Sequence, residues 1–245
     1  MPIGLQAGLW GLLGASALVL GAALAYLLRL PRRVTSGVLA FGCGVLISAV
    51  AYDLLAEGFK LGGFAPILGG ALAGSVIYTI ANWLVTHHGG RRRRRRASGP
   101  SADGESSGTA IAIGALLDGI PESLVLGVGL VAGGAISMPM LVAILLSNLP
   151  EGMSSAADMR RAGRGKAYVF GVWVGVALLS GLAAGLGATV FSNASPQTLA
   201  AVNAVAAGAL LTMIVDTMVP EALRGQGGAT GLLVVLGLLS AFALR

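Results

Sequence analysis

Two short segments place a proline next to a glutamate inside long apolar runs. They read DGIPES at residues 118–123 and SNLPEG at residues 147–152. Pro121 and Pro150 each lack the N–H that would bond the carbonyl four residues earlier in a helix, so each frees one backbone oxygen. A freed carbonyl inside a membrane must find another partner, such as a water or an ion. The two segments therefore predict a pocket of oxygen atoms suited to a cation or a proton.

The spacing of the polar residues selects candidate ligands within these segments. Asp118 and Glu122 are four residues apart, as are Ser147 and Glu151, and residues at this spacing share one face of a helix. Asn148 lies three residues before Glu151 and joins the second group. We therefore predict that Asp118, Glu122, Ser147, Asn148 and Glu151 are metal ligands.

Seven of the ten acidic residues fall within apolar runs. Besides the three in the two segments, these are Asp53 and Glu57 in DLLAE, and Asp216 and Glu221 in DTMVPE. A carboxylate at the centre of a membrane helix costs about 2.5–3.5 kcal/mol, and no lysine, arginine or histidine lies near the middle of the runs to offset it. A mobile cation or proton is the simplest remaining partner. The four outer acids are predicted as pathway acids, or as interfacial residues if they lie near the ends of their spans.

The elements that must position these residues are membrane spans. The chain has 245 residues, of which 56% are hydrophobic and only 11% charged, against about 25% charged in soluble domains. The apolar runs are continuous rather than alternating, which predicts helices and not barrel strands. Eight spans are expected, at residues 6–28, 35–57, 62–86, 109–132, 136–157, 167–191, 198–222 and 228–244.

The basic residues test this number of spans. Fourteen of the 16 follow odd-numbered spans, in residues 29–33, 91–96 and 160–166 and at Arg224. Because basic loops stay in the cytoplasm, this bias places both termini outside, in a multi-pass protein of the cell membrane. The net charge of +6 thus reflects topology, and no nucleic-acid partner is expected.

The order of the spans predicts an internal symmetry. Spans one to three (residues 1–86) precede an Arg-rich loop, residues 87–108, which is expected to be cytoplasmic and disordered. The central spans four and five (109–157) carry the two Pro-Glu steps, and spans six to eight occupy residues 158–245. Spans two and seven carry related acid pairs, so we predict an all-α integral membrane protein whose eight transmembrane helices form a 3+2+3 arrangement with inverted repeats.

With these features the chain resembles the ZIP (Zrt- and Irt-like protein) family of divalent metal transporters. Span four of that family reads His-Asn-x-Pro-Glu-Gly where this chain has residues 118–123, and span five has polar residues before x-Pro-Glu-Gly, as in residues 147–152. The acid pairs of spans two and seven are similar to the family's as well. The resemblance implies alternating access, a central role for Glu122 and Glu151, and a homodimer.

Three departures from the family pattern bear on the metal. Asp118 stands in place of a histidine, Gly119 in place of a ligating asparagine, and Ala184 in place of the glutamate that completes a binuclear centre. The sequence therefore offers one site with oxygen ligands only. Such a site favours harder ions such as Mn²⁺, Mg²⁺ or Ca²⁺ more than a histidine site does. Carboxylates also bind zinc, so Zn²⁺, Mn²⁺, Fe²⁺ and Cd²⁺ are all candidate substrates, and no prosthetic group is expected.

The leading functional hypothesis is a secondary transporter that moves a divalent metal ion across the lipid bilayer into the cytoplasm. A second hypothesis keeps the fold but makes the acids a proton relay for a carrier of another small solute. A third is a non-transporting membrane sensor whose working part is the arginine run 91–96. The sequence contains nothing resembling a nucleophile, a catalytic triad or a nucleotide-binding loop within reach of these candidate sites, so no enzymatic activity is predicted.

Overall fold

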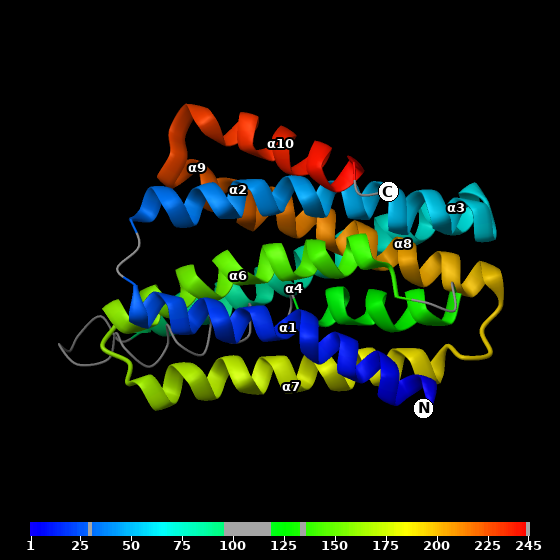
Figure 1. The fold of residues 1–245 in the computed structure, drawn as a ribbon, viewed down its shortest axis with the longest axis horizontal. Helices are drawn as coiled ribbons and strands as arrows, with labels where there is room; N and C mark the ends of the chain where they lie inside the picture. The colour runs from blue at the N-terminus through cyan, green and yellow to red at the C-terminus, as the bar shows by residue number, and fades with distance from the viewer. Residues whose placement is uncertain (29–30, 96–118, 133–135, 244–245) are drawn as a thin grey trace.

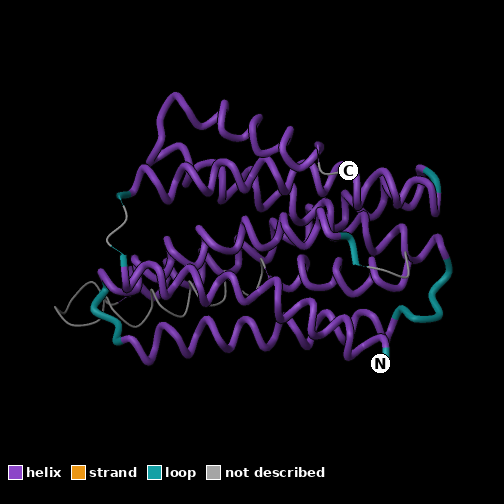
Figure 2. The backbone as a smooth tube through the Cα atoms, viewed as in Figure 1, coloured by secondary structure: helices purple, strands orange, loops and turns teal. Residues whose placement is uncertain are grey.

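A computed structural model describes residues 1–28, 31–95, 119–132 and 136–243 of the chain. This part of the chain consists of helices joined by short turns and contains no β-strand, as the continuous apolar runs predicted. Figure 1 shows the helices side by side with their axes roughly aligned, and Figure 2 shows how short the connecting turns are. The predicted all-α class is confirmed for these residues.

Six helical segments are each long and apolar enough to cross a membrane. They are α1 (Ile3–Leu27), a segment built from α2 (Arg32–Ala49), η1 (Val50–Ala56) and α3 (Glu57–Gly62), then α4 (Phe64–Arg95), α6 (Met138–Arg161), α7 (Lys166–Val190), and a segment built from α8 (Pro196–Met213), η2 (Ile214–Met218) and α9 (Val219–Gln226). Two shorter apolar helices are Gly119–Ala132 and α10 (Thr230–Ala243), the latter preceded by the 3₁₀ turn η3 (Gly227–Ala229). Such a set of apolar helices is typical of a multi-pass membrane protein.

The structure differs from the predicted boundaries in two regions. Helix α4 continues to Arg95, so residues 87–95 are helical, although the loop 87–108 was expected to be disordered. Arginine is a good helix former, which is compatible with a helix that continues into the basic run. The fourth and eighth spans are represented by helices of only 14 residues, about 21 Å long and shorter than a 30 Å hydrocarbon core. Residues 109–118 of the predicted fourth span lie outside the described residues.

Local residue chemistry explains where several helices begin and end. Gly63 and Gly163 both have φ of 77°, a conformation that glycine adopts without steric cost, and they end α3 and α6. Ser195 begins α8 because its side chain accepts a hydrogen bond from the backbone N–H of Thr198, with Pro196 at the first helical position. Proline at that position gives up no helical hydrogen bond.

Two π-helical stretches interrupt the long second and seventh spans. The first, η1, contains Asp53, and the second, η2, contains Asp216. A π-helix bonds residue i to i+5, is rare, and occurs frequently at functional sites. Both aspartates of the predicted acid pairs therefore lie where the regular α-helix is broken, which their sequence spacing did not predict.

Glycine brings several pairs of helices into close contact, among them α1 with α7 through Gly8 and Gly181 and the four pairs that follow. These four pairs are α1 with α6 through Gly21 and Gly152, Gly119–Ala132 with α7 through Gly127 and Gly187, α2 with α10 through Gly44 and Gly237, and α4 with α8 through Gly74 and Gly208. A Cβ atom added at Gly44 would overlap the carbonyl oxygen of Val234. Small residues of this kind let membrane helices pack backbone to backbone.

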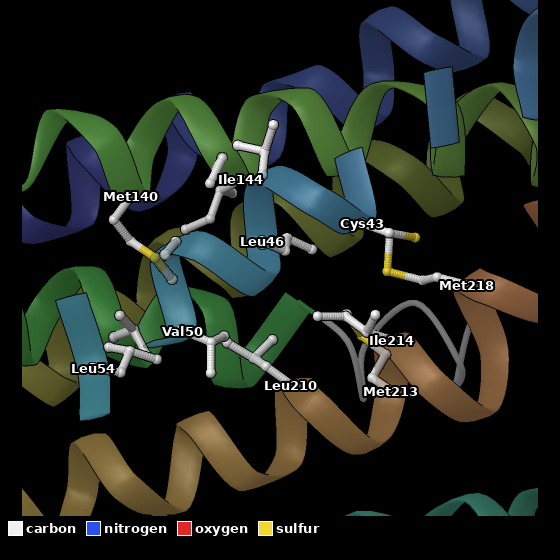
Figure 3. Close-up of a cluster of buried hydrophobic side chains, with 14 of the residues drawn as sticks. Cys43, Leu46, Val50, Leu54, Met140, Ile144, Leu210, Met213, Ile214 and Met218 are labelled. Atoms are coloured by element: carbon white, nitrogen blue, oxygen red, sulfur yellow. The ribbon is translucent and has the colours of Figure 1, made fainter. Parts of the chain in front are cut away.

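The largest buried apolar cluster lies between span two, α6 and span seven. Figure 3 shows side chains from these three segments pointing toward one another: Cys43, Leu46, Val50, Leu54, Met140, Ile144, Leu210, Met213, Ile214 and Met218. Val125 and Leu126 of the Gly119–Ala132 helix belong to the same cluster. The two Pro-Glu helices are thus joined to both long interrupted spans by one core.

Candidate metal site

Glu122 and Ser147 lie together in the interior of the bundle. Glu122 is 2% exposed on the Gly119–Ala132 helix, and Ser147 is fully buried on α6. The Ser147 hydroxyl lies 3.4 Å from Glu122 Oε1 and also donates to the carbonyl of Ile144 at 3.0 Å. The first distance exceeds the usual range of about 2.5–3.0 Å for such a bond, so the contact is weak. The structure therefore brings one predicted ligand from each Pro-Glu motif into the same buried space.

The other predicted ligands are placed differently. Asn148 is 3% exposed, and its side-chain nitrogen donates to the carbonyl of Gly14 on α1 at 3.2 Å. That contact fixes the amide group, and a metal would bind Asn148 through its oxygen. Glu151 is half-buried one turn further along α6. Asp118 lies outside the described residues.

The carbonyl that Pro150 frees is covered by a neighbouring helix. Pro150 lies inside α6 and cannot bond the carbonyl of Leu146. A Cβ atom added at Gly42 of α2 would lie 3.1 Å from that oxygen, so the backbone of α2 packs directly against it. The Leu146 carbonyl therefore faces α2. The packing of α2 accounts for its surroundings without the cation pocket that the sequence predicted there.

The four predicted pathway acids differ in exposure and contacts. Asp53 is half-buried in η1, and Asp216 is exposed in η2. Glu57 is 55% exposed and forms an ion pair with Lys60 at 2.7 Å, an arrangement that contributes little to stability when solvated. Glu221 is half-buried, and its carboxylate accepts a hydrogen bond from Ser154.

Carboxylates alone do not complete a metal site in the described part of the chain. Within residues 1–28, 31–95, 119–132 and 136–243, no group of three or more His, Cys, Asp or Glu side chains is placed to hold a metal ion. A cation at Glu122 would therefore need neutral oxygens as well. Hydroxyl, amide and carbonyl oxygens are suitable ligands for hard divalent ions.

No protein-family model matches this chain, and no curated protein matches it either. The functional assignment rests on the residues and their geometry.

Several buried polar residues were missed by motif reasoning. They are Ser36, Ser48, Ser123, Ser180, Asn203 and Thr230. Asn203 Oδ1 is buried without a hydrogen-bond donor, which is costly. Each of these residues is a polar side chain in an apolar run, and that is the feature by which the sequence could have revealed them.

A cavity lies away from these candidate residues. It has a volume of about 310 Å³ and opens between α1 and α7, and its lining residues are Leu12, Ser16, Val19, Leu20, Val174, Ala177 and Leu178. The Ser16 hydroxyl donates to the carbonyl of Leu13 of its own helix at 2.5 Å. The cavity offers apolar surface and no carboxylate, so it is not the candidate cation site.

We expect the Ser154–Glu221 hydrogen bond to couple α6 to α9. Hydrogen bonds to charged groups contribute about 1.5–3 kcal/mol when buried, and this one is only half-buried, so a coupling energy of about 1 kcal/mol is expected. A double-mutant cycle of Ser154→Ala and Glu221→Ala, read as free energy of unfolding in detergent, measures it. The matched cycle with Ser155→Ala should give a coupling close to zero. Equal coupling in both cycles would show that the hydrogen bond is not the cause.

Proposed function

We propose that this protein is a ZIP-like secondary transporter that carries a divalent metal cation into the cytoplasm, with Glu122 as the central ligand. The observation that carries the proposal is the position of Glu122, which is 2% exposed on the Gly119–Ala132 helix and faces Ser147 of the proline-containing helix α6. A carboxylate buried in an apolar bundle is expensive unless a cation, a proton or hydrogen bonds compensate it. A divalent cation supplies that compensation and leaves again when the site opens.

Repeated contacts support the 3+2+3 arrangement with inverted repeats. Gly44 and Gly208 are 164 residues apart, and Gly74 and Gly237 are 163 residues apart. Span two pairs with span eight through Gly44 and Gly237, and span seven pairs with span three through Gly208 and Gly74. The two repeats are spans one to three and spans six to eight. If they are exchanged, span two takes the place of span seven and span eight that of span three, so that one pair becomes the other.

The details of these two contacts also agree. In both pairs each glycine faces the carbonyl oxygen three residues before the glycine of the other helix: Val234, Phe41, Val205 and Ala71. The two π-helical aspartates, Asp53 and Asp216, are again 163 residues apart. Offsets of 163 or 164 residues at three separate positions are what an internal repeat predicts.

Two further glycine contacts follow the same exchange. Span one packs against span five through Gly21 and Gly152, while span six packs against span four through Gly187 and Gly127. Spans one to three would thus hold the central helix that carries Ser147, and spans six to eight would hold the central helix that carries Glu122. A site between two repeats is the usual position in transporters with alternating access.

The direction of the helices supports the predicted topology. Figure 1 shows the beginning of α1 and the end of α10 toward one end of the bundle, and the ends of α1, α6 and α9 toward the other. The basic residues Arg32, Arg33, Arg160, Arg164 and Arg224 belong to the second end. If basic turns stay in the cytoplasm, both termini are extracytoplasmic and the transported ion passes along the bundle toward the arginines.

One observation favours the alternative of a proton-coupled carrier. The described residues contain no group of three acidic or other strong metal ligands, and a single buried carboxylate is sufficient to carry a proton. The two functions differ in what the purified protein binds.

Uptake by the purified protein in proteoliposomes tests the proposal. Vesicles containing a metal-sensitive dye should show saturable uptake of at least one ion from a panel of Mn²⁺, Fe²⁺, Zn²⁺, Cd²⁺, Mg²⁺ and Ca²⁺, and protein-free vesicles should not. We expect Mn²⁺ to compete with Zn²⁺ more strongly at this site than it does at a site with histidine ligands, because the ligands here are oxygens. Absence of binding and of uptake for every ion, together with proton flux, would support the carrier of another solute.

A further inference from the structure

Ser180 is a buried hydroxyl that the two Pro-Glu motifs do not include. It lies in the middle of α7, is 2% exposed, and has apolar neighbours along its helix. A Cβ atom added at Gly119 would lie 3.0 Å from Ser180 Oγ, a tight contact at which the Ser180 hydroxyl has to give way by a few tenths of an ångström. The Ser180 hydroxyl thus borders the space that a side chain at position 119 would occupy.

This contact places Ser180 near the candidate site. Gly119 and Glu122 are three residues apart on one helix, and residues at that spacing are neighbours on its surface, about 5–6 Å apart at Cβ. Ser147 approaches Glu122 from α6. Hydroxyl groups from α6 and α7 therefore lie around the same turn of the Gly119–Ala132 helix.

We propose that Ser180 supplies a neutral hydroxyl oxygen to the cation bound at Glu122, and that a side chain at position 119 would press against that hydroxyl. The proposal rests on the transport function given above and names a further determinant of its ion specificity. A hydroxyl adds an oxygen ligand without adding charge, which favours a hard divalent ion over a softer one.

A purely structural role for Ser180 makes different predictions. A serine in a membrane helix often bonds the carbonyl of the preceding turn or a neighbouring helix. In that case its removal would change stability, but not the ratio of affinities for hard and soft ions. The ion ratio is therefore the quantity to measure.

Equilibrium binding of Mn²⁺ and Cd²⁺ to the full-length protein in detergent tests the proposal. Ser180→Ala should weaken Mn²⁺ binding by at least about 10-fold, because even groups that only orient the ligands of a metal cost that much when removed. Ser180→Cys should weaken Mn²⁺ binding and strengthen Cd²⁺ binding, because sulfur prefers the softer ion. An unchanged Mn²⁺ to Cd²⁺ affinity ratio in Ser180→Cys would overturn the proposal.

Two glycines of the same helix provide a matched control. Gly119→Ala should displace the Ser180 hydroxyl and weaken Mn²⁺ binding as Ser180→Ala does, whereas Gly129→Ala should bind as wild type, since an added Cβ there meets no atom within 4 Å. Thermal unfolding of each variant separates lost binding from lost folding. Equal Mn²⁺ affinity in Gly119→Ala and Gly129→Ala, with both folded, also overturns the proposal.

The same measurements separate this proposal from the transport function. If Glu122→Gln loses Mn²⁺ binding and Ser180→Ala keeps it at the wild-type level, Ser180 is not a ligand and the transport function stands. If the wild-type protein itself binds neither Mn²⁺ nor Cd²⁺, the role of Ser180 fails, and the transport function fails only if the other ions of the uptake panel are not bound or transported either.

Discussion

Glu122→Gln should abolish divalent cation transport while leaving the protein folded. Glutamine has nearly the same shape, and its carbonyl oxygen can still accept the hydrogen bond that Ser147 Oγ offers to Glu122 Oε1 at 3.4 Å. What the substitution removes is the negative charge of a side chain that is 2% exposed. We expect the initial uptake rate in proteoliposomes to fall by at least about 100-fold. That is the largest loss usually caused by mutating groups that only orient the ligands of a metal, and a ligand itself should cost at least as much.

A charge-matched variant makes this result specific. Glu105→Gln removes the same charge from the segment between α4 and the Gly119–Ala132 helix, outside every apolar run, and should transport as wild type. Size-exclusion profiles and thermal unfolding of both variants show whether the fold is kept. Wild-type uptake by folded Glu122→Gln would remove the basis for a carboxylate site, and the function proposed for it would be withdrawn.

The helical fold could be predicted because its determinants are local. Continuous apolar runs separated by basic or glycine-containing turns are sufficient to indicate membrane helices. The π-helical stretches at Asp53 and Asp216 were not predicted, because neither stretch has a proline or glycine among its residues to mark it. The length of α4 was underestimated because the basic run, read as a loop, is also compatible with a helix.

The candidate site was predictable only where one helix supplies the pattern. The spacing of Ser147, Asn148 and Glu151 identified one polar group on α6, but it could not indicate that Asn148 bonds the Gly14 carbonyl of α1. The contact of Ser180 with the Gly119 position likewise joins residues 61 apart in the chain. Such contacts depend on which helices pack together, and helix spacing alone does not carry that information.

The strongest stability effect is expected where helices pack backbone to backbone. Gly74→Ala in α4 would place a methyl group on the carbonyl oxygen of Val205 in α8, so the two helices must separate. Overpacking of this kind costs about 1–3 kcal/mol, and here backbone rather than a flexible side chain must move. Urea or thermal unfolding in detergent should show the loss.

Gly69→Ala, in the same helix, is the matched control. An added Cβ at Gly69 meets no atom within 4 Å, so this variant should stay within about 0.5 kcal/mol of wild type. Gly237→Ala in α10 extends the test to the other repeat, because its added methyl group would overlap the Phe41 carbonyl of α2 in the same way. If α4–α8 and α2–α10 are equivalent contacts of two inverted repeats, Gly74→Ala and Gly237→Ala should destabilise by similar amounts. A large loss for Gly74→Ala with none for Gly237→Ala would show that the two contacts are not equivalent, and the symmetry would then lose its main support.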